Sequence, residues 1–229
     1  MAWSSILQAL LVFLPAYVAN MSPVIVAKLI PGWKTPIDGG RIGKDGQRIL
    51  GPGKTWRGLV GGAVFGAITA LVIAGVTPFY DEPGLFAGWD YGAKGFDGAP
   101  IGSSTPCNDT PEGPAAVCTG PPTSPMWAVA LFGGFVGFMA LVGDAVKSYF
   151  KRRTGRDRGR PWVPFDQLDF VVFGVAAMAL ASPLLADGWI RAALLGDWVV
   201  LATLFILTPI LHFVVNVIGY FLKLKEVPW

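Results

Sequence analysis

The stretch MWAVALFGGFVGFMALVGDAVKSYF, residues 126–150, decides the fold class of this chain. It is an apolar run that exceeds the roughly 20 residues a helix needs to cross the hydrocarbon core of a bilayer. Its last part carries ionisable groups, and one of them, Asp144, lies several residues inside the apolar run. The stretch therefore predicts a membrane-spanning helix that brings charged side chains to one membrane face.

The rest of the chain has the same character. Of its 229 residues 53% are hydrophobic and only 14% are charged, whereas a soluble domain carries about 25% charged residues. The first apolar run is no signal peptide, because it lacks a basic start and continues too far. The sequence predicts an all-α, polytopic membrane protein, a single membrane domain over residues 1–229 with about five transmembrane helices. The apolar runs cover 3–30, 58–76, 126–150, 168–186 and 198–222.

Basic residues predict how these helices are oriented, because cytoplasmic loops carry an excess of Lys and Arg. Loop 31–57 has six basic and two acidic residues, and segment 147–170 has seven and three. Loop 78–124 has one basic and six acidic residues. We therefore expect the N-terminus and loop 78–124 outside, and both basic segments and the C-terminus in the cytoplasm. Cys107 and Cys118 both fall in the external loop, where an oxidising environment favours a structural disulfide.

Glycines recur every fourth residue inside two of the apolar runs. Gly58, Gly62 and Gly66 follow this spacing in one run, and Gly133 and Gly137 follow it in another. Small residues at that spacing form a smooth groove that lets a second helix approach closely. We interpret both sets as helix-packing surfaces.

A first candidate site is the basic loop that ends in GPGKTWRG, residues 51–58. A P-loop needs a glycine five positions before Gly53, and Arg48 stands there, so that motif is absent. Loop 31–57 nevertheless contains seven glycines among its six basic residues, and such loops hold phosphate with backbone N–H groups and cationic side chains. The alternative is a flexible basic loop that touches anionic lipid headgroups.

A second candidate site lies at the charged end of the opening stretch. Asp144, Lys147, Ser148 and Lys151 stand at helical spacings of three, one and three, so they share one helix face. Asp144 lies too far inside the apolar run to be explained as a helix cap, and buried ionisable groups in membranes are costly. This face therefore predicts a functional site.

Two further carboxylates, Asp166 and Asp169, share a face at the start of the next apolar run. Acidic residues are stable at a helix N-terminus without any function. Together with Asp144, however, they form an acidic set among the basic residues of 147–170, as expected where carboxylates hold Mg²⁺ and cations hold phosphate. The alternative is a set of internal salt bridges, such as Asp144 with Lys147.

The last apolar run carries a polar stripe. His212, Asn216, Gly219 and Lys223 repeat at spacings of four, three and four, which places them on one helix face. A lone histidine without nearby cysteines or a second histidine does not make a zinc site. We expect the stripe to line a polar cavity with Lys223 at its cytoplasmic mouth.

The two charged segments together carry a family resemblance. Ser148-x-x-Lys151-Arg152 and Asp166-Gln-Leu-Asp169 resemble the two halves of the CDP-diacylglycerol synthase signature, S-x-x-K-R followed by D-R-x-D. The H-G-G triplet of that signature is absent, and the chain has fewer spans than those enzymes. Both departures match the archaeal branch of the family, the CDP-archaeol synthases. The resemblance covers nearly the whole chain except residues 78–124, and it extends to GPGKTWRG and to the C-terminal LKLKEVPW.

The resemblance implies a reaction at the cytoplasmic face of the cell membrane. CTP and 2,3-bis-O-geranylgeranylglycerol 1-phosphate, an isoprenoid ether lipid phosphate, would give the CDP-lipid and pyrophosphate, with Mg²⁺ as cofactor and no nucleic acid as partner. Asp144 and Asp169 are the preferred metal ligands, and Asp166 is the next. The expected catalytic residues are Asp144, Lys147, Lys151, Asp166 and Asp169. The expected nucleotide phosphate contacts are Lys54, Thr55, Arg57, Ser148 and Arg152. The expected lining of the lipid-headgroup cavity is His212, Asn216 and Lys223.

Other functions stay open on the residues alone. A cytidylyltransferase that prefers ester lipids would have the same chemistry, and a lipid or polyprenol kinase would release a nucleoside diphosphate. A small transporter needs a polar path across the membrane, whereas the polar residues here gather near one face. A structural membrane protein that binds anionic lipid leaves the three aspartates unexplained. The sequence says nothing about the oligomeric state.

Overall fold

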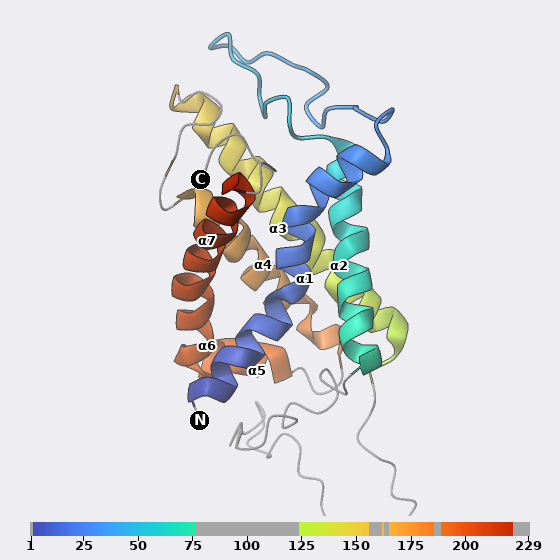
Figure 1. Ribbon diagram of the computed structural model, residues 1–229, viewed down its shortest axis with the longest axis vertical. Helices are drawn as coiled ribbons and strands as arrows, with labels where there is room; N and C mark the ends of the chain where they lie inside the picture. The colour runs from blue at the N-terminus through green and yellow to red at the C-terminus, as the bar shows by residue number, and fades with distance from the viewer. Residues whose placement is uncertain (1, 77–123, 156–161, 163–164, 186–188, 222–229) are drawn as a thin grey trace, which may run out of the picture.

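The computed structural model describes residues 2–76, 124–155, 162, 165–185 and 189–221 (Figure 1). Every regular element in these ranges is helical, and the only β pairing there is two isolated bridges in loop 31–57. The helices are α1 (Ala2–Leu29), α2 (Trp56–Val76), α3 (Met126–Arg153), α4 (Phe165–Ala181) with the 3₁₀ turn η2 (Ser182–Leu184), α5 (Trp189–Gly196), α6 (Trp198–Ala202), the π-helical η4 (Thr203–Leu207) and α7 (Thr208–Phe221).

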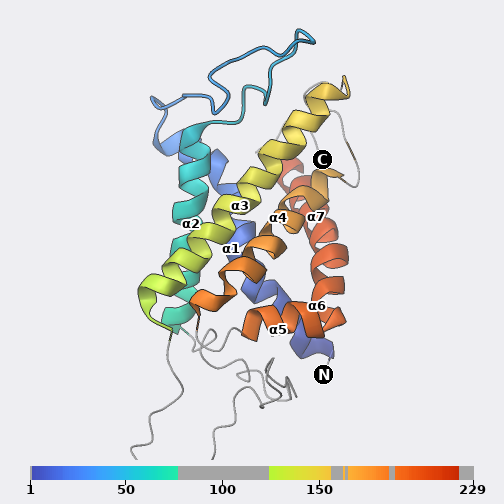
Figure 2. The ribbon, with the colours of Figure 1, turned by 180° about the vertical axis from the view of Figure 1, so that it is seen from behind.

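The predicted fold class is confirmed. Four helical segments are long and apolar enough to span a membrane, within Ser5–Leu29, Trp56–Val76, Met126–Arg153 and Phe165–Leu184. The fifth predicted span consists of three consecutive helical pieces, α6, η4 and α7, and the π-helical η4 lies between the other two. The short helix α5 lies across the end of the bundle that holds the N-terminus (Figure 2).

The predicted glycine packing is also confirmed, between α2 and α3. A Cβ atom added to Gly66 would collide with the carbonyl oxygen of Gly133, and one added to Gly137 would lie 2.6 Å from the carbonyl oxygen of Gly62. The two backbones are therefore in direct contact, which only glycine permits at these positions. We call Gly62, Gly66, Gly133 and Gly137 the glycine seam.

Helix α1 runs obliquely across the bundle despite two internal prolines (Figure 1). Pro23 has no N–H for the carbonyl of Ala19, four residues earlier. The hydroxyl of Ser22 donates a hydrogen bond to that carbonyl instead, at 2.8 Å, and Ser22 is fully buried. A polar side chain thus satisfies the acceptor that proline leaves open, as a helix in hydrocarbon requires.

The two ends of the bundle differ. One end carries the N-terminus and α5, and the opposite end carries loop 31–57, the charged end of α3 and the end of α7 (Figures 1 and 2). This arrangement has the alternation that the basic residues predict, and the assignment of the second end to the cytoplasm stays a prediction. Loop 78–124 with Cys107 and Cys118 lies outside the described residues.

Candidate active site

Loop 31–57 is folded around one buried carboxylate, that of Asp38. Its oxygens accept hydrogen bonds from the backbone N–H groups of Gly40 (2.9 Å) and Leu50 (3.0 Å) and from the guanidinium of Arg48 (3.0 Å). The side chain is only 1% exposed. Burial acts to raise the pKa of Asp38, but these donors outweigh it and hold the pKa below its ordinary value. The loop therefore has a fixed shape with an ionised anchor.

A tight turn then delivers Lys54 to α3. Gly51 has a φ of 93°, a conformation that favours glycine, and its carbonyl accepts the N–H of Lys54 at 3.4 Å. A Cβ atom on Gly51 would lie 3.4 Å from Nε of Arg152, so α3 also packs closely here. The ammonium of Lys54 forms an ion pair with the carboxylate of Asp144.

The aspartates of α3 and α4 meet because the two backbones are very close. A Cβ atom on Gly143 would lie 2.6 Å from the carbonyl oxygen of Asp169 and 2.9 Å from the ring of Phe173. Gly143 directly precedes Asp144, so this contact brings the carboxylates of two helices into one site. The sequence predicted that both residues belong to a site but gave no sign of this contact.

Lys147 forms ion pairs with all three predicted acidic residues. Its Nζ atom lies 3.1 Å from Oδ1 of Asp144 and 2.9 Å from Oδ2 of Asp169. It also lies 3.5 Å from Oδ1 of Asp166. One ammonium therefore joins carboxylates that come from two different helices.

Asp166 has a different environment from the other two aspartates. Its carboxylate accepts a hydrogen bond from the backbone N–H of Trp162 at 2.7 Å. The ammonium of Lys151 donates to both of its oxygens, at 3.1 and 3.2 Å. It thus ties the start of α4 to the end of α3, much as an acidic residue reaches back to a preceding N–H in a capping box. Its position serves the local fold as well as the site.

We call these six residues the ionic cluster: Lys54, Asp144, Lys147, Lys151, Asp166 and Asp169. Three ammonium groups face three carboxylates, so the cluster is electrically balanced. Asp169 is the most enclosed of the three acids, with a side chain 6% exposed. Its Oδ1 atom is buried and has no hydrogen-bond partner among the described residues, an arrangement that costs free energy unless a ligand uses it. The internal salt bridges that the sequence left open are therefore formed.

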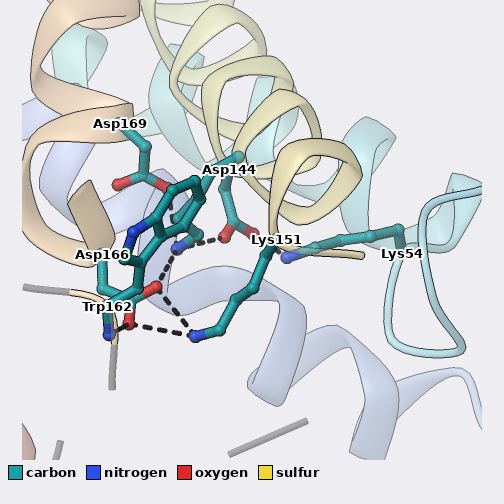
Figure 3. A network of polar contacts seen from close by, with 7 residues as sticks. Lys54, Asp144, Lys151, Trp162, Asp166 and Asp169 are labelled. Atoms are coloured by element: carbon teal, nitrogen blue, oxygen red, sulfur yellow. Dashed lines mark hydrogen bonds and ion pairs between the residues drawn. The ribbon is translucent and has the colours of Figure 1, made fainter. Parts of the chain in front are cut away.

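No group of three or more His, Cys, Asp or Glu side chains in the described part of the chain is arranged as a ready-made metal site. The reason is visible in Figure 3, where the carboxylates are turned toward ammonium groups. The predicted ligands Asp144, Asp166 and Asp169 are nevertheless brought together, and carboxylate oxygens are the donors that Mg²⁺ prefers. Their chemistry fits a divalent cation.

Two predicted phosphate ligands have structural partners. The hydroxyl of Thr55 accepts the N–H of Gly58 at 3.4 Å and so caps the start of α2. The guanidinium of Arg57 donates to the backbone carbonyls of Ile30 (2.8 Å) and Pro31 (3.4 Å). Both residues hold the junction of α1, the loop and α2 together.

The remaining predicted residues surround the cluster less closely. Ser148 is half-buried on α3 beside Lys147, and Arg152 lies against Gly51. The ring of His212, on α7, stands 5.6 Å from that of Phe170, which follows Asp169 on α4, so this residue of the stripe packs against α4. The side chain of Asn216 and the whole of Lys223 lie outside the described residues.

Sequence reasoning missed a second contact between the loop and α3. Asp45, in the loop, forms an ion pair with Arg153, whose guanidinium also lies over the ring of Tyr149 at 5.1 Å from its centroid. Nothing in the spacing of these residues pairs them, because they are more than a hundred positions apart. The Asp38 anchor had a local sign, since an Asp-Gly-Gly run is typical of a turn closed by the aspartate side chain.

The comparisons with known proteins identify the family of the chain. The family model described as CarS-like, CDP-archaeol synthase, matches residues 3–82 and 123–229, most of the chain. The chain belongs to the CDP-archaeol synthase family. The CDP-archaeol synthase of Methanocorpusculum labreanum is 36% identical over 94% of this chain and 99% of that protein. The one of Thermococcus kodakarensis is 32% identical over the full length of both chains.

A solved structure supports the fold of this CDP-archaeol synthase family member. It is described as an intramembrane enzyme for archaeal membrane lipid biosynthesis, and it is 26% identical to this chain. The two superpose with a TM-score of 0.53 over 93% of this chain and 94% of the other. The chain is accordingly a multi-pass membrane enzyme, a cytidylyltransferase of archaeal lipid synthesis.

Proposed function

We propose that the chain transfers a cytidylyl group from CTP to 2,3-bis-O-geranylgeranylglycerol 1-phosphate, with Mg²⁺, releasing pyrophosphate and leaving the CDP-lipid in the membrane. The observation that carries this proposal is the ionic cluster. It gathers three lysines and three aspartates from the loop, α3 and α4 at one end of a membrane-spanning bundle. That end is where a lipid phosphate and a water-soluble nucleotide meet.

The chemistry makes clear demands on such a site. The lipid phosphate oxygen is already ionised at neutral pH, so its attack on the α-phosphorus of CTP needs no strong general base. Two highly charged anions must instead be brought together and held in line. Positioning and electrostatic stabilisation therefore carry most of the rate enhancement, as in other phosphoryl and nucleotidyl transfers.

The lysines of the cluster suit this task. Lys54 enters from the loop, while Lys147 and Lys151 are one helical turn apart on α3, so cations surround the cluster from two sides. Each ends in an ammonium on a flexible stem that can move from a carboxylate to a phosphate oxygen. We assign them to the phosphates of CTP and of the lipid, with Ser148 and Arg152 beside them.

Asp144 and Asp169 would hold the Mg²⁺ ion. Two observations support this assignment: Asp169 has a buried oxygen atom with no hydrogen-bond partner among the residues that the structure describes, and Gly143 places the backbone of Asp169 next to Asp144. When bound, Mg²⁺ supplies positive charge that neutralises the phosphates and the departing pyrophosphate. Asp166 is the third candidate ligand, although Trp162 and Lys151 already occupy its carboxylate.

We also propose that this end of the bundle faces the cytoplasm, where CTP is available. The excess of basic residues in 31–57 and 147–170 supports that orientation. Labelling of intact cells with a membrane-impermeant maleimide tests it independently of catalysis. In a protein that carries Cys107→Ser and Cys118→Ser, the variant Lys44→Cys should stay unlabelled until the cells are opened, and labelling in intact cells would contradict the orientation.

A turnover assay on purified protein in detergent tests the reaction. CTP labelled at the α-phosphate is supplied with Mg²⁺ and either the geranylgeranyl ether phosphate or ordinary ester phosphatidate, with EDTA as the control. We expect label in the lipid phase with the ether substrate, equimolar pyrophosphate in the water phase, and neither product with EDTA.

Each alternative gives a different pattern. Faster labelling of ester phosphatidate would overturn the ether preference but retain the cytidylyl transfer. In a parallel assay with CTP labelled at the γ-phosphate, label that enters the lipid phase from this position only would identify a kinase. Product formation that persists in EDTA would contradict the requirement for Mg²⁺.

A further inference from the structure

The ammonium of Lys147 occupies the place toward which all three carboxylates of the cluster converge. It lies within 3.5 Å of an oxygen of each acid, and it is the one side chain in the described part of the chain with ion pairs to all three. Among the three acids of the cluster, Lys54 forms an ion pair only with Asp144, and Lys151 only with Asp166. Lys147 therefore serves as the counter-ion of the acidic set.

Asp169 shows that this pairing leaves binding capacity unused. Lys147 contacts its Oδ2 atom at 2.9 Å, while its Oδ1 atom is buried without a hydrogen-bond partner in the described part of the chain. The side chain is 6% exposed, so water does not readily compensate that oxygen. A monovalent ammonium with fixed geometry satisfies one of the two oxygens, whereas a divalent cation attracts both more strongly.

A divalent cation and the Lys147 ammonium cannot share these carboxylates. At separations of a few ångströms in a poorly hydrated site, the repulsion between the two cations is large. The lysine stem has four carbons and rotates freely enough to carry the ammonium to a neighbouring anion. The phosphate groups of the nucleotide are the anions that the proposed function brings to the same place.

We propose that Lys147 is an exchangeable counter-ion: it neutralises Asp144 and Asp169 when no divalent cation is bound, and it moves to the nucleotide phosphates when the cation takes those carboxylates. The proposal rests on the proposed function, and it adds a coupling between the two ligands. Because Lys147 gains a new partner only when nucleotide is present, the cation should bind weakly alone and more tightly with nucleotide. By reciprocity, the nucleotide gains the same factor from the cation.

The first test measures Mn²⁺ binding to the purified protein by electron paramagnetic resonance, without nucleotide. Lys147→Met keeps the length of the side chain and removes its charge. We expect this variant to bind Mn²⁺ at least about tenfold more tightly than the wild type, because the competing ammonium is gone. Lys151→Met removes an equal charge that contacts Asp166 alone, so we expect a gain below about threefold.

A double variant links any gain to the cluster. Lys147→Met with Asp169→Asn should lose the additional affinity, because the acid that the lysine released is no longer a strong ligand. Equal Mn²⁺ affinities in the wild type and Lys147→Met would overturn the exchange. A gain in Lys151→Met as large as that in Lys147→Met would also overturn it, because only the overall charge would then matter.

A second test uses the unaltered protein, in case Lys147→Met does not fold. Lysine acetylation by an amine-reactive ester is followed by mass spectrometry at each lysine. Mg²⁺ alone should raise the acetylation rate of Lys147 by at least about threefold and leave that of Lys151 nearly unchanged. Adding a non-hydrolysable CTP analogue should lower the Lys147 rate again. A Lys147 rate that does not respond to Mg²⁺ would overturn the proposal.

Transfer of label from CTP to lipid, measured on the same preparations, keeps the two proposals apart. Product formation by the wild type together with equal Mn²⁺ affinities would retain the cytidylyl transfer and remove only the exchange. Absence of product under all conditions would remove the proposed function, whatever the Mn²⁺ titrations give.

Discussion

The glycine seam and the ionic cluster both include residues of α3, and they are built in opposite ways. In the seam, side chains are absent and two backbones touch, so shape alone holds α2 against α3. In the cluster, long charged side chains from three separate segments converge, and charge balance holds them. The seam has no room for an added atom, while the exchange that we propose requires Lys147 to move. The proposed movement would thus take place beside a closely packed pair of helices.

The largest effect should come from breaking the cluster without touching the seam. Asp144→Asn removes a carboxylate that pairs with Lys54 and Lys147, and we expect turnover to fall by about a thousandfold, roughly 4 kcal/mol of barrier. The control is Asp45→Asn, which removes an exposed carboxylate at the same end of the molecule. We expect that variant to keep turnover within about threefold of the wild type, because exposed ion pairs contribute little.

Turnover of CTP at saturating Mg²⁺, normalised to folded protein from size-exclusion chromatography, measures both variants. An Asp144→Asn protein with full Mg²⁺-dependent turnover would remove Asp144 from the site.

The next effect should come from breaking the seam without touching the cluster. Gly66→Ala places a methyl group against the carbonyl of Gly133, and neither backbone can yield, so we expect a loss of about 1–3 kcal/mol in the free energy of unfolding. Gly75→Ala, on the same helix, is the matched control, because the added Cβ would meet no atom of another described segment within 4 Å. Thermal unfolding in detergent compares them, and equal melting temperatures would contradict the backbone contact.

Gly143 links the seam and the cluster, because it makes a close backbone contact like those of the seam and thereby positions a residue of the cluster. Gly143→Ala should push the backbone of Asp169 and the ring of Phe173 away from α3. We expect a roughly tenfold loss of turnover, about 1.4 kcal/mol, since small displacements of aligned groups are costly in transfer reactions. Cation affinity and turnover should fall together. A loss of stability with unchanged turnover per folded molecule would show that the contact serves packing alone.

The smallest effect concerns the loop that supplies Lys54. Donors hold the pKa of Asp38 below its ordinary value, so the ionised anchor stabilises the loop fully above the unfolded pKa, about 4. That stabilisation is lost as the pH falls through the lower folded pKa. At neutral pH, Asp38→Asn should therefore open the loop and raise the rate of tryptic cleavage within 31–57 by a few fold. Asp45→Asn is the control, and equal cleavage in the two variants would contradict the anchor.

The sequence predicted the parts of this molecule whose signals are local. Apolar runs predicted the spans, because hydrocarbon excludes unpaired backbone groups, and the four-residue glycine spacing predicted the seam, because that spacing is one helix face. Helical spacing likewise placed Asp144, Lys147 and Lys151 together. The residues Thr55 and Arg57 were also singled out, but their polar groups have partners in the backbone.

The sequence by itself determined which charged residues lie at the ends of the apolar helices and which of them share a helix face. Only the tertiary structure decided that Lys54 reaches Asp144 across 90 positions, that Gly143 brings Asp169 beside it, and that one ammonium serves three acids. The physical reason is the distance along the chain over which each kind of signal acts. Periodicity reports neighbours within one helix, whereas ion pairing between helices depends on how closely their backbones approach, and that follows from packing along the whole of α3.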